Sequence, residues 1–305
     1  MDPTALLKII KKDFRQTKPW AEFIEYKGYK TKILQNGSFL HEFTLGPISI
    51  IKSFRPELTE ESLKEIQGIA DRKANLICKL SPNYDFDITL KEKFKYEGIN
   101  STMSPSRTCI RDLTEDYDKI FNSFSENTRY KINRSVRERD KIEIIHQPTS
   151  QQINNFYDYV QKRQAFKKFI SFQRDEVLKL NQFFNKDSHI ITAYDKDGRV
   201  VVSNMYFTYD EKVTYFMGSL NSENHKSKAG YQLIHEALQY FKKLGIKVYD
   251  FEGISDARDP ENYKAWEGYS NFKMKFGNQM FEYPLTIIRY NNLIFKGMVR
   301  IFGIN

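Results

Sequence analysis

Residues 213–251 read VTYFMGSLNSENHKSKAGYQLIHEALQYFKKLGIKVYDF. Positions 213–217 are rich in β-branched and aromatic residues, which predicts a strand. Residues 229–244 repeat apolar side chains at a helical spacing, and Gly245 follows where a helix cap is expected. Residues 246–251 predict a second strand. This succession of strand, helix and strand indicates an α/β domain.

The rest of the chain predicts two α/β units of similar element order. In the first half, Asn36-Gly37 between two β-type runs is a strong hairpin signal. In the second half, Asp195-Lys196-Asp197-Gly198 separates two further strands in the same way. The repeated order suggests an internal structural duplication. The expected strands are 30–34, 38–43, 48–51, 76–80, 108–113, 142–146, 189–194, 200–209 and 271–277, and the expected helices are 4–14, 59–73, 115–125, 125–139, 150–165, 174–184 and 285–302.

The composition narrows the class of protein. The chain has 305 residues with 40% hydrophobic residues, enough for sizeable cores, so a disordered chain is excluded. No apolar run reaches the roughly 20 residues that span a bilayer. The first residues do not resemble a secretory signal, and the two cysteines sit in strand-like runs, so we expect buried free thiols and a cytoplasmic protein. The net charge of +9 points to an anionic partner without identifying it.

Two basic segments are candidates for anion binding. Lys226, Lys228 and Gly230 lie in a loop just before a predicted helix, whose free amide groups favour phosphate. The alternative is that both lysines are simply solvated and the glycine eases packing. Within residues 127–141, Lys131, Arg134 and Arg137 recur every three positions, so they line one side of a helix that is able to follow a phosphodiester backbone, or else form a solvated helix face.

Two further segments carry groups suited to acyl transfer. The run Tyr249-Asp250-Phe251-Glu252-Gly253 ends a strand with two carboxylates, which serve either as a base or substrate ligand or as a cap. In residues 271–277 a period of two places Lys273 and Lys275 on one side of an expected strand, where a lysine is able to stabilise an oxyanion. The five histidines lack metal-ligand spacing, and no P-loop, G-x-S-x-G or G-x-G-x-x-G motif is present, so we expect neither a metal nor a nucleotide-fold enzyme.

Taken in order, these features resemble the FemABX family of peptidoglycan bridge aminoacyltransferases over nearly the whole chain. The similarity is greatest to the short members that lack a coiled-coil arm. The residues that carry the resemblance are Trp20, Leu45-Gly46-Pro47, Thr128 to Ser135, Tyr231, Gly245, Tyr249 to Gly253, Gly268 and Phe272 to Gly277.

The resemblance implies a pair of GNAT-like (acyl-CoA N-acyltransferase-like) domains with mixed sheets flanked by helices. The first would comprise residues 1–140 and a C-terminal helix that returns to it, 285–305, and the second residues 141–284. The implied activity is transfer of an amino acid from aminoacyl-tRNA to an amine of a peptidoglycan precursor, lipid-linked or UDP-linked, without a cofactor. Peripheral contact with the inner membrane surface is a further expectation.

The resemblance also implies roles for particular residues. Lys273, with Phe272 beside it, would stabilise the oxyanion of the tetrahedral intermediate. Residues expected to border the donor are Lys226, Lys228, Gly230, Tyr231, Arg129, Lys131 and Arg134. Residues expected to border the acceptor are Trp20, Ser81, Tyr249 and Glu252. Family members often carry an acidic residue where this chain has Ser81, which puts the identity of the acceptor in question.

Two other functions are compatible with the same residues. An acyl-CoA N-acyltransferase acting on an amino sugar or peptide would use the loop at 226–230 for the cofactor-like donor. A module that binds RNA or a membrane surface would use the basic patches and residues 285–302 without catalysis.

Overall fold

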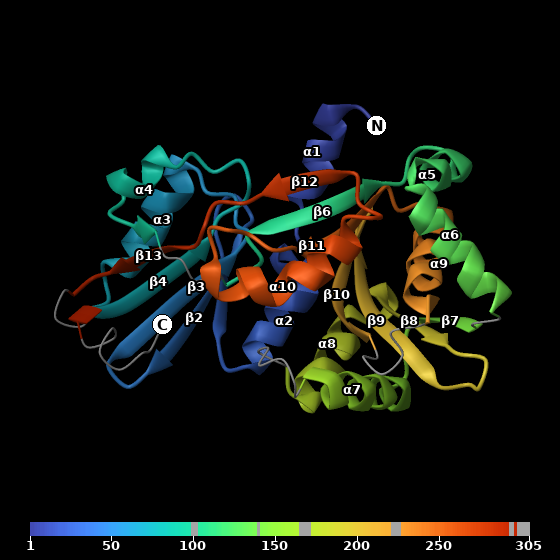
Figure 1. The fold of residues 1–305 in the computed structure, drawn as a ribbon. Helices are drawn as coiled ribbons and strands as arrows, with labels where there is room; N and C mark the ends of the chain where they lie inside the picture. Colours follow the sequence, from blue (N-terminus) through green and yellow to red (C-terminus); the bar gives the residue numbers. More distant parts are fainter. Residues whose placement is uncertain (99–102, 139–140, 165–171, 221–226, 293–295, 298–305) are drawn as a thin grey trace. The chain divides into compact units, whose positions relative to one another are not determined.

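The structure is a computed structural model that describes residues 1–98, 103–138, 141–164, 172–220, 227–292 and 296–297. The chain forms two compact units, each built around one sheet (Figure 1). The first unit comprises Met1–Phe14, Thr108–Ile254 and Ala265–Phe281, and the second comprises Arg15–Arg107, Ser255–Lys264 and Glu282–Asn305.

These units divide the chain elsewhere than at the predicted boundaries, residues 140/141 and 284/285. Residues 108–138 belong to the first unit because their strand pairs with residues 248–253 and their second helix packs on residues 229–243. Residues 1–14 also belong to that unit, although the segment that follows them does not. The sequence contains no local signal for these passages of the chain from one unit to the other, since they depend on contacts between residues that are far apart along the chain.

The first unit contains a mixed sheet of seven strands in the order β12-β6-β11-β10-β9-β8-β7. The pairs β6–β11, β9–β10, β8–β9 and β7–β8 are antiparallel, whereas β10 and β11 are parallel. The strands are β6 (Arg107–Asp112), β7 (Lys141–His146), β8 (Ser188–Tyr194), β9 (Val200–Tyr209), β10 (Lys212–Leu220), β11 (Val248–Gly253) and β12 (Gln279–Glu282).

Helices cover both faces of this sheet. Tyr206 of β9 faces a core with Leu233, Ala237 and Phe241, whereas Phe207 packs on the other face against Phe184. Successive side chains of a strand point to opposite faces, so α9 lies on one face and α8 on the other. The helices are α1 (Pro3–Lys11), α5 (Tyr117–Ser123), α6 (Glu126–Arg137), α7 (Ser150–Gln164), α8 (Arg174–Phe184), η2 (Asn185–Asp187), α9 (Ala229–Lys243) and α10 (Pro260–Lys273), the last beginning in the second unit.

The second unit contains a six-stranded mixed sheet in the order β1-β2-β3-β4-β13-β5. Its main core joins one face to α3, with Leu63 and Ile66 of the helix against Ile51 and Leu76 of the strands. The elements are η1 (Phe14–Gln16), α2 (Lys18–Tyr26), β1 (Lys30–Ile33), β2 (Phe39–Leu45), β3 (Ile48–Phe54), α3 (Glu60–Ala70), β4 (Asn75–Ser81), α4 (Thr89–Lys93), β5 (Glu97–Gly98) and β13 (Ile287–Tyr290).

The two units repeat one arrangement. In the first, β8, β9 and β10 form an antiparallel meander, and α9 leads to β11, parallel to β10. In the second, β1, β2 and β3 form the meander, and α3 leads to β4, parallel to β3. The duplication suggested by the sequence is therefore present in the fold, and the predicted α/β class with mixed sheets is confirmed.

Two predicted elements are wrong. Residues 271–277 are not a strand, because α10 continues to Lys273 and the chain then turns through Gly277. The predicted helix at 285–302 begins instead as strand β13, antiparallel to β4, so this part returns to the second unit as a strand. Residues 293–295 and 298–302 of that prediction lie outside the described residues.

Candidate functional site

The parallel strands β10 and β11 are paired over only part of their length. Their register runs from Lys212↔Val248 to Thr214↔Asp250, although β10 continues to Leu220 and β11 to Gly253. Beyond Thr214 the pairing of β10 with β9 shifts between Tyr215 and Met217, which marks a bulge. A bulge bends the strand that carries it, so it accounts for the parting of β10 from β11.

The corresponding strands of the second unit do not part. β3 and β4 stay in register from Ile48↔Asn75 to Phe54↔Ser81 without a shift. Where two strands pair along their length, the N–H and C=O groups that face each other are hydrogen-bonded to the neighbouring strand. Where the strands part, these groups are left to bond a ligand. Of the two repeats, the first unit is therefore the one whose backbone suits ligand binding between the parallel strands.

Lys273 lies where β10 and β11 part. Its Nζ donates to the carbonyl oxygens of Gly253, at 2.8 Å, and Glu252, at 3.4 Å. The same ammonium lies 5.1 Å from the centroid of the Tyr215 ring, which belongs to β10. Burial lowers the pKa of Lys273 from its usual value. The lysine chosen from the sequence thus bridges the two strands, from the end of a helix rather than from a strand.

The Tyr215 ring is fixed by its neighbours on β9 and β10. Its hydroxyl donates to Asn204 Oδ1 at 3.0 Å, and Asn204 Nδ2 donates to Tyr206 at 3.0 Å. A Cβ at Gly218 would lie 2.2 Å from Asn204 Oδ1 and 2.4 Å from the Tyr215 hydroxyl, so this arrangement requires glycine there. Sequence reasoning missed Tyr215 and Gly218, since nothing local distinguishes them from ordinary strand residues.

Glu252 occupies the turn that ends β11. Its backbone has a φ of 55°, in the left-handed region that side chains other than glycine rarely adopt. The register of β11 with β6 shifts between Asp250 and Gly253 at the same place. Such strain at a half-buried residue whose backbone carbonyl accepts from Lys273 is typical of a functional site.

Tyr231, in the first turn of α9, lies between two lysines. Its hydroxyl accepts from Lys275 Nζ at 3.0 Å and from Lys131 Nζ at 3.3 Å. Although burial alone would raise the pKa of Tyr231, the two ammonium groups lower it overall. Phe272 packs edge-on against this ring, with the centroids 5.2 Å apart. The structure thus brings Tyr231, Lys131 and Phe272 together and adds Lys275, which was not among the predicted donor residues.

The loop before α9 is only partly described. Lys226 lies outside the described residues. Lys228 is the N-cap residue and makes no side-chain cap, whereas Ser227 Oγ accepts from the amide of Ala229 at 3.1 Å. Gly230 is buried in the first turn of the helix. These positions fit the predicted anion-binding role of a helix N-terminus, which the structure does not test.

Two predicted donor residues are engaged elsewhere. Arg129 Nη1 donates to the carbonyl of Asn122 at 2.9 Å and to that of Phe124, so it caps the end of α5. Arg134 Nε pairs with Glu138 Oε1 at 2.7 Å on the same helix. Of the basic residues predicted in α6, Lys131 is the one that reaches Tyr231.

The predicted acceptor residues fall in both units. In the first unit, Tyr249 is fully buried and packs against Tyr206, Phe241 and Phe251, which suits a core residue rather than a substrate contact. In the second unit, Ser81 is buried and its Oγ lies 2.9 Å from Thr286 Oγ1.

Trp20 lies in the same unit as Ser81. Its ring is buried and lies edge-on to Phe54, with the centroids 5.9 Å apart. Phe54 is in register with Ser81, so Trp20 and Ser81 lie near the same end of the β3–β4 pair.

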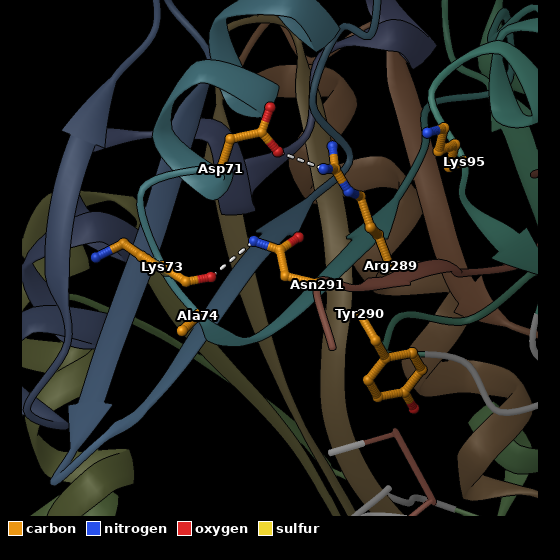
Figure 2. Close-up of a pocket in the computed structure, with 7 residues that line it drawn as sticks. All are labelled: Asp71, Lys73, Ala74, Lys95, Arg289, Tyr290 and Asn291. Carbon is orange, nitrogen blue, oxygen red and sulfur yellow. Dashed lines mark hydrogen bonds and ion pairs between the residues drawn. The ribbon is translucent and has the colours of Figure 1, made fainter. Parts of the chain in front are cut away.

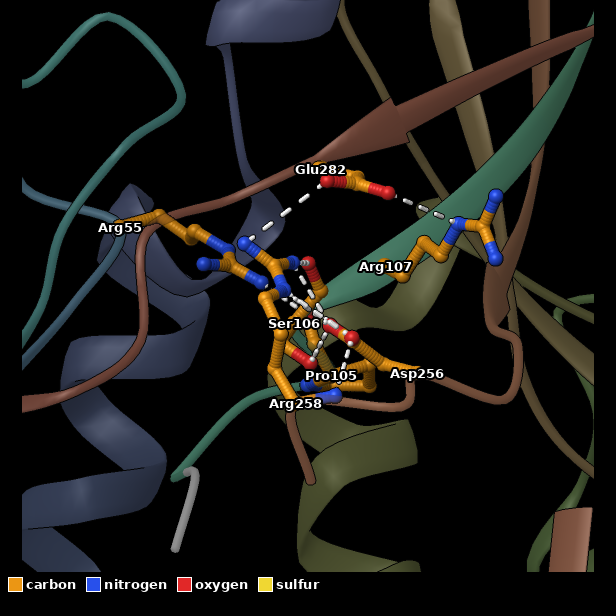
Figure 3. A network of polar contacts seen from close by, with 7 residues as sticks. All are labelled: Arg55, Pro105, Ser106, Arg107, Asp256, Arg258 and Glu282. Carbon is orange, nitrogen blue, oxygen red and sulfur yellow. Dashed lines mark hydrogen bonds and ion pairs between the residues drawn. The ribbon is translucent and has the colours of Figure 1, made fainter. Parts of the chain in front are cut away.

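A polar network that the sequence did not reveal lies in the second unit (Figure 3). Asp256 accepts from Ser106 Oγ at 2.6 Å and from Arg258 Nη2 at 2.6 Å, and Arg258 Nη1 lies 3.8 Å from Glu282. Burial alone would raise the pKa of Asp256, but these donors lower it to about 2. Arg55 stacks on Tyr283 with its guanidinium carbon 3.5 Å from the ring centroid. Because its acids are matched by arginines, the network ties loops together rather than offering a free charge.

A pocket of about 410 Å³ also lies in the second unit (Figure 2). Two of its cations are already paired, Lys73 with Glu42 and Arg289 with Asp71. It contains none of the residues predicted for the site. Its lining residues are Asp71, Lys73, Ala74, Lys95, Arg289, Tyr290 and Asn291.

Among the described residues, no three metal-binding side chains are grouped to hold an ion. No described helix has the length and apolar composition to cross a membrane. Both cysteines are buried and unpaired, as expected from the sequence.

Comparison with known proteins agrees with this geometry. Residues 122–265, which include the parting strands and α9, match the acetyltransferase (GNAT) domain family. The structure of a tandem GNAT protein from the clavulanic acid biosynthesis pathway superposes with a TM-score of 0.54 at 9% identity, covering 85% of this chain and 81% of that one. The chain has a tandem GNAT fold.

The resemblance to the FemABX enzymes is confirmed at the level of this fold. The crystal structure of FemX matches with a TM-score of 0.73 at 12% identity, covering 99% of this chain and 98% of that one. The C-terminal domain of a putative lysylphosphatidylglycerol synthetase from Agrobacterium fabrum matches with a TM-score of 0.59 at 13% identity, covering 96% and 92%. No curated protein matches the sequence. The GNAT-domain match supports an acyltransferase, and these structures support the fold.

Proposed function

We propose that this tandem GNAT protein is an aminoacyltransferase that moves an amino acid from aminoacyl-tRNA to an amine of a peptidoglycan precursor. It would act in the cytoplasm, where charged tRNA is found. The observation that carries the proposal is Lys273, whose ammonium is held between parted parallel strands on the carbonyls of Glu252 and Gly253.

Attack of an amine on an ester carbonyl forms a tetrahedral oxyanion. A cation placed in advance stabilises that charge without a covalent enzyme intermediate. Lys273 Nζ donates to two backbone carbonyls, and the third proton of its ammonium is left to donate to a developing oxyanion. Burial lowers the pKa of Lys273, and it also leaves the charge of the ammonium form little screened by water.

The acceptor amine must bind beside this group and lose a proton. Glu252 is the carboxylate at the turn that also supplies a carbonyl to Lys273. We assign to it the binding of the acceptor ammonium and the removal of its proton. Since this chain has Ser81 where the family often carries an acidic residue, the proposed acceptor is either a lipid-linked or UDP-linked muropeptide or a related cell-wall polymer.

The donor is a polyanion, which suits the cations around Tyr231. Lys131 and Lys275 share the Tyr231 hydroxyl, and no described carboxylate pairs with either ammonium. Two positive charges that converge without a counter-ion attract phosphate. Together with Lys228 and the helix N-terminus at Gly230, they would bind the phosphates near the charged end of tRNA.

The test is a transfer assay with the purified protein, a set of aminoacyl-tRNAs and lipid-linked or UDP-linked precursors. Mass spectrometry should detect the gain of one amino acid on the acceptor. Lys273→Met should lower turnover by roughly tenfold or more, as expected for loss of one oxyanion donor. Lys243→Met, an exposed lysine of α9, is the matched control and should leave turnover unchanged. Absence of transfer from every aminoacyl-tRNA contradicts the proposal.

The GNAT-domain match favours one alternative, an acyl-CoA N-acyltransferase that uses the same strands. It predicts transfer from acyl-CoA to an amino sugar or peptide and a thermal shift with acyl-CoA but not with tRNA. The same assay with acyl-CoA in place of charged tRNA separates the two functions. A protein that binds RNA or vesicles but transfers nothing from either donor would be a binding module.

A further inference from the structure

A buried ion pair lies behind the turn that holds Lys273. Lys212 is 1% exposed and Asp250 is 3% exposed, and Lys212 Nζ lies 3.5 Å from Asp250 Oδ2. The other oxygen, Asp250 Oδ1, accepts from Thr108 Oγ1 at 2.6 Å. Lys212 Nζ also donates to the carbonyl of Ile10 at 3.2 Å. Isolated charges are costly to bury, so these partners fix the orientation of the Asp250 carboxylate.

The same carboxylate shapes the end of β11. Asp250 Oδ1 also accepts from the backbone amide of Glu252 at 2.8 Å, which closes a turn of the Asx type. Within this turn Glu252 has its φ of 55°, a conformation that costs free energy for a residue with a side chain. The hydrogen bond from the Glu252 amide to Asp250 offsets that cost. The register of β11 with β6 shifts across the same residues.

The turned backbone in turn holds Lys273. The carbonyls of Glu252 and Gly253 are the two acceptors of its ammonium, at 3.4 Å and 2.8 Å. If the left-handed turn relaxed toward an ordinary strand, these carbonyls would rotate away, because adjacent strand carbonyls point in opposite directions. The position of Lys273 therefore depends on a side chain that does not touch it.

We propose that Asp250, held in place by Lys212 and Thr108, is the positioning residue for Lys273. The effect of Asp250 on turnover rests on the proposed aminoacyl transfer. The placement of the lysine itself does not depend on which donor or acceptor the protein uses. None of the three residues would touch substrate, so each acts only through the turn at Glu252.

Two double variants separate the turn from the ion pair. Lys212→Met/Asp250→Asn removes both charges but keeps an oxygen that accepts from the Glu252 amide. Lys212→Met/Asp250→Ala removes the same charges and that oxygen. The buried hydrogen bond between Thr192 and Ser203, 2.7 Å long on β8 and β9, supplies a control, Thr192→Val, for a general loss of stability.

The first readout is the rate at which an amine-reactive reagent labels Lys273 in the full chain, followed by peptide mass spectrometry. We expect the Asn variant to label like wild type and the Ala variant to label at least about fivefold faster, as for a lost hydrogen bond to a charged group. Thr192→Val should label like wild type. Equal labelling in the two double variants overturns the proposal. This readout needs no substrate, so it stands apart from the test of the proposed function.

The second readout is the transfer assay. We expect the Ala variant to lower kcat by about tenfold with little change in the donor KM, because misplacing one group affects the transition state most. The Asn variant should retain most of kcat. If kcat falls equally in both, the ion pair is merely structural and the proposal fails. If the double variants do not fold, Thr108→Val replaces them, and unchanged labelling of Lys273 in that variant overturns the proposal.

Discussion

A buried titratable side chain makes the free energy of unfolding of this protein depend on pH. His41 is fully buried, with Nδ1 3.1 Å from Thr31 Oγ1, and burial lowers its pKa from 6.5 to about 4. Above pH 6.5 the imidazole is neutral in both the folded and unfolded states. Between pH 6.5 and 4 the unfolded chain takes up a proton that the folded chain refuses, so the free energy of unfolding falls as the pH falls.

We therefore expect the second unit to lose up to about 3 kcal/mol of unfolding free energy from His41 on acidification. Denaturant unfolding at pH 7 and pH 4.5 measures the loss. His41→Gln should reduce the difference between the two pH values. An equal difference in wild type and His41→Gln would contradict the assignment.

Tyr231 allows a second prediction at the scale of the residue. Lys275 and Lys131 lower the pKa of its phenol, against the opposite effect of burial. Lys275→Met should raise the pKa of Tyr231, because one of the two ammonium groups that stabilise the phenolate is removed. NMR titration of ¹³Cζ-labelled tyrosine gives the value, with Lys243→Met as the control. A Tyr231 pKa that does not rise would mean that Lys275 does not hold the hydroxyl in solution.

At the scale of elements, the packing around β10 decides where a side chain is tolerated. A Cβ at Gly218 would overlap Asn204 and Tyr215, whereas a Cβ at Gly68 in α3 would meet nothing within 4 Å. Gly218→Ala should lower the free energy of unfolding by about 1–3 kcal/mol through overpacking. Gly68→Ala should raise it by about 0.5–1 kcal/mol, since alanine favours the helix.

Thermal unfolding of the two glycine variants checks the prediction, because they make the same chemical change in different surroundings. Gly218→Ala should also displace Tyr215 and so speed the labelling of Lys273, which lies over that ring. Gly68→Ala should leave this labelling unchanged. Opposite signs of the two stability changes are the essential expectation, and two stabilising changes would show that β10 does not hold Tyr215 closely.

A comparison of predicted and observed helices and strands shows which of them local sequence patterns predict. The sequence predicted α8 and β9 with their observed bounds, since α8 has the periodicity of an amphipathic helix and β9 is a run rich in β-branched and aromatic residues. It missed α10 because the apolar residues of 260–273 do not gather on one face and Gly268 interrupts them. It singled out Lys273 but placed it on a strand rather than at the end of α10. Polar and apolar residues alternate over a few positions at this helix end as they would in a strand.

At the scale of the whole molecule, the chain passes between its two units more than once. Residues 1–14 belong to the first unit and residues 15–107 to the second. Phe14 anchors the first of these segments, with ring centroids 5.8–6.2 Å from Phe184, Phe207, Tyr209 and Phe216. It is fully buried, so its removal leaves a cavity in the core of the first unit.

Phe14→Ala should therefore cost about 3–5 kcal/mol, felt in the unfolding of the first unit. Leu63→Ala, at a fully buried position of α3, is the matched change in the second unit. Hydrogen exchange during partial unfolding distinguishes the units by their amides. Phe14→Ala should speed exchange mainly in β8 to β11, and Leu63→Ala mainly in β3 and β4. A loss confined to β3 and β4 in Phe14→Ala would contradict the division of the chain.

The sequence by itself determined the class of the fold, the order of most strands and helices, their repetition in two halves, and the resemblance that singled out Lys273 and Tyr231. Those features depend on periodicity, turn residues and composition, which are local. Only the tertiary structure decided that β10 and β11 part while β3 and β4 do not, that Lys275 joins Lys131 at Tyr231, and that Arg129 caps a helix. It also brought Lys212 and Thr108 to Asp250. These pairings join residues far apart along the chain, and the free energy that selects them comes from burial and hydrogen bonding in the folded core, which no short stretch of sequence contains.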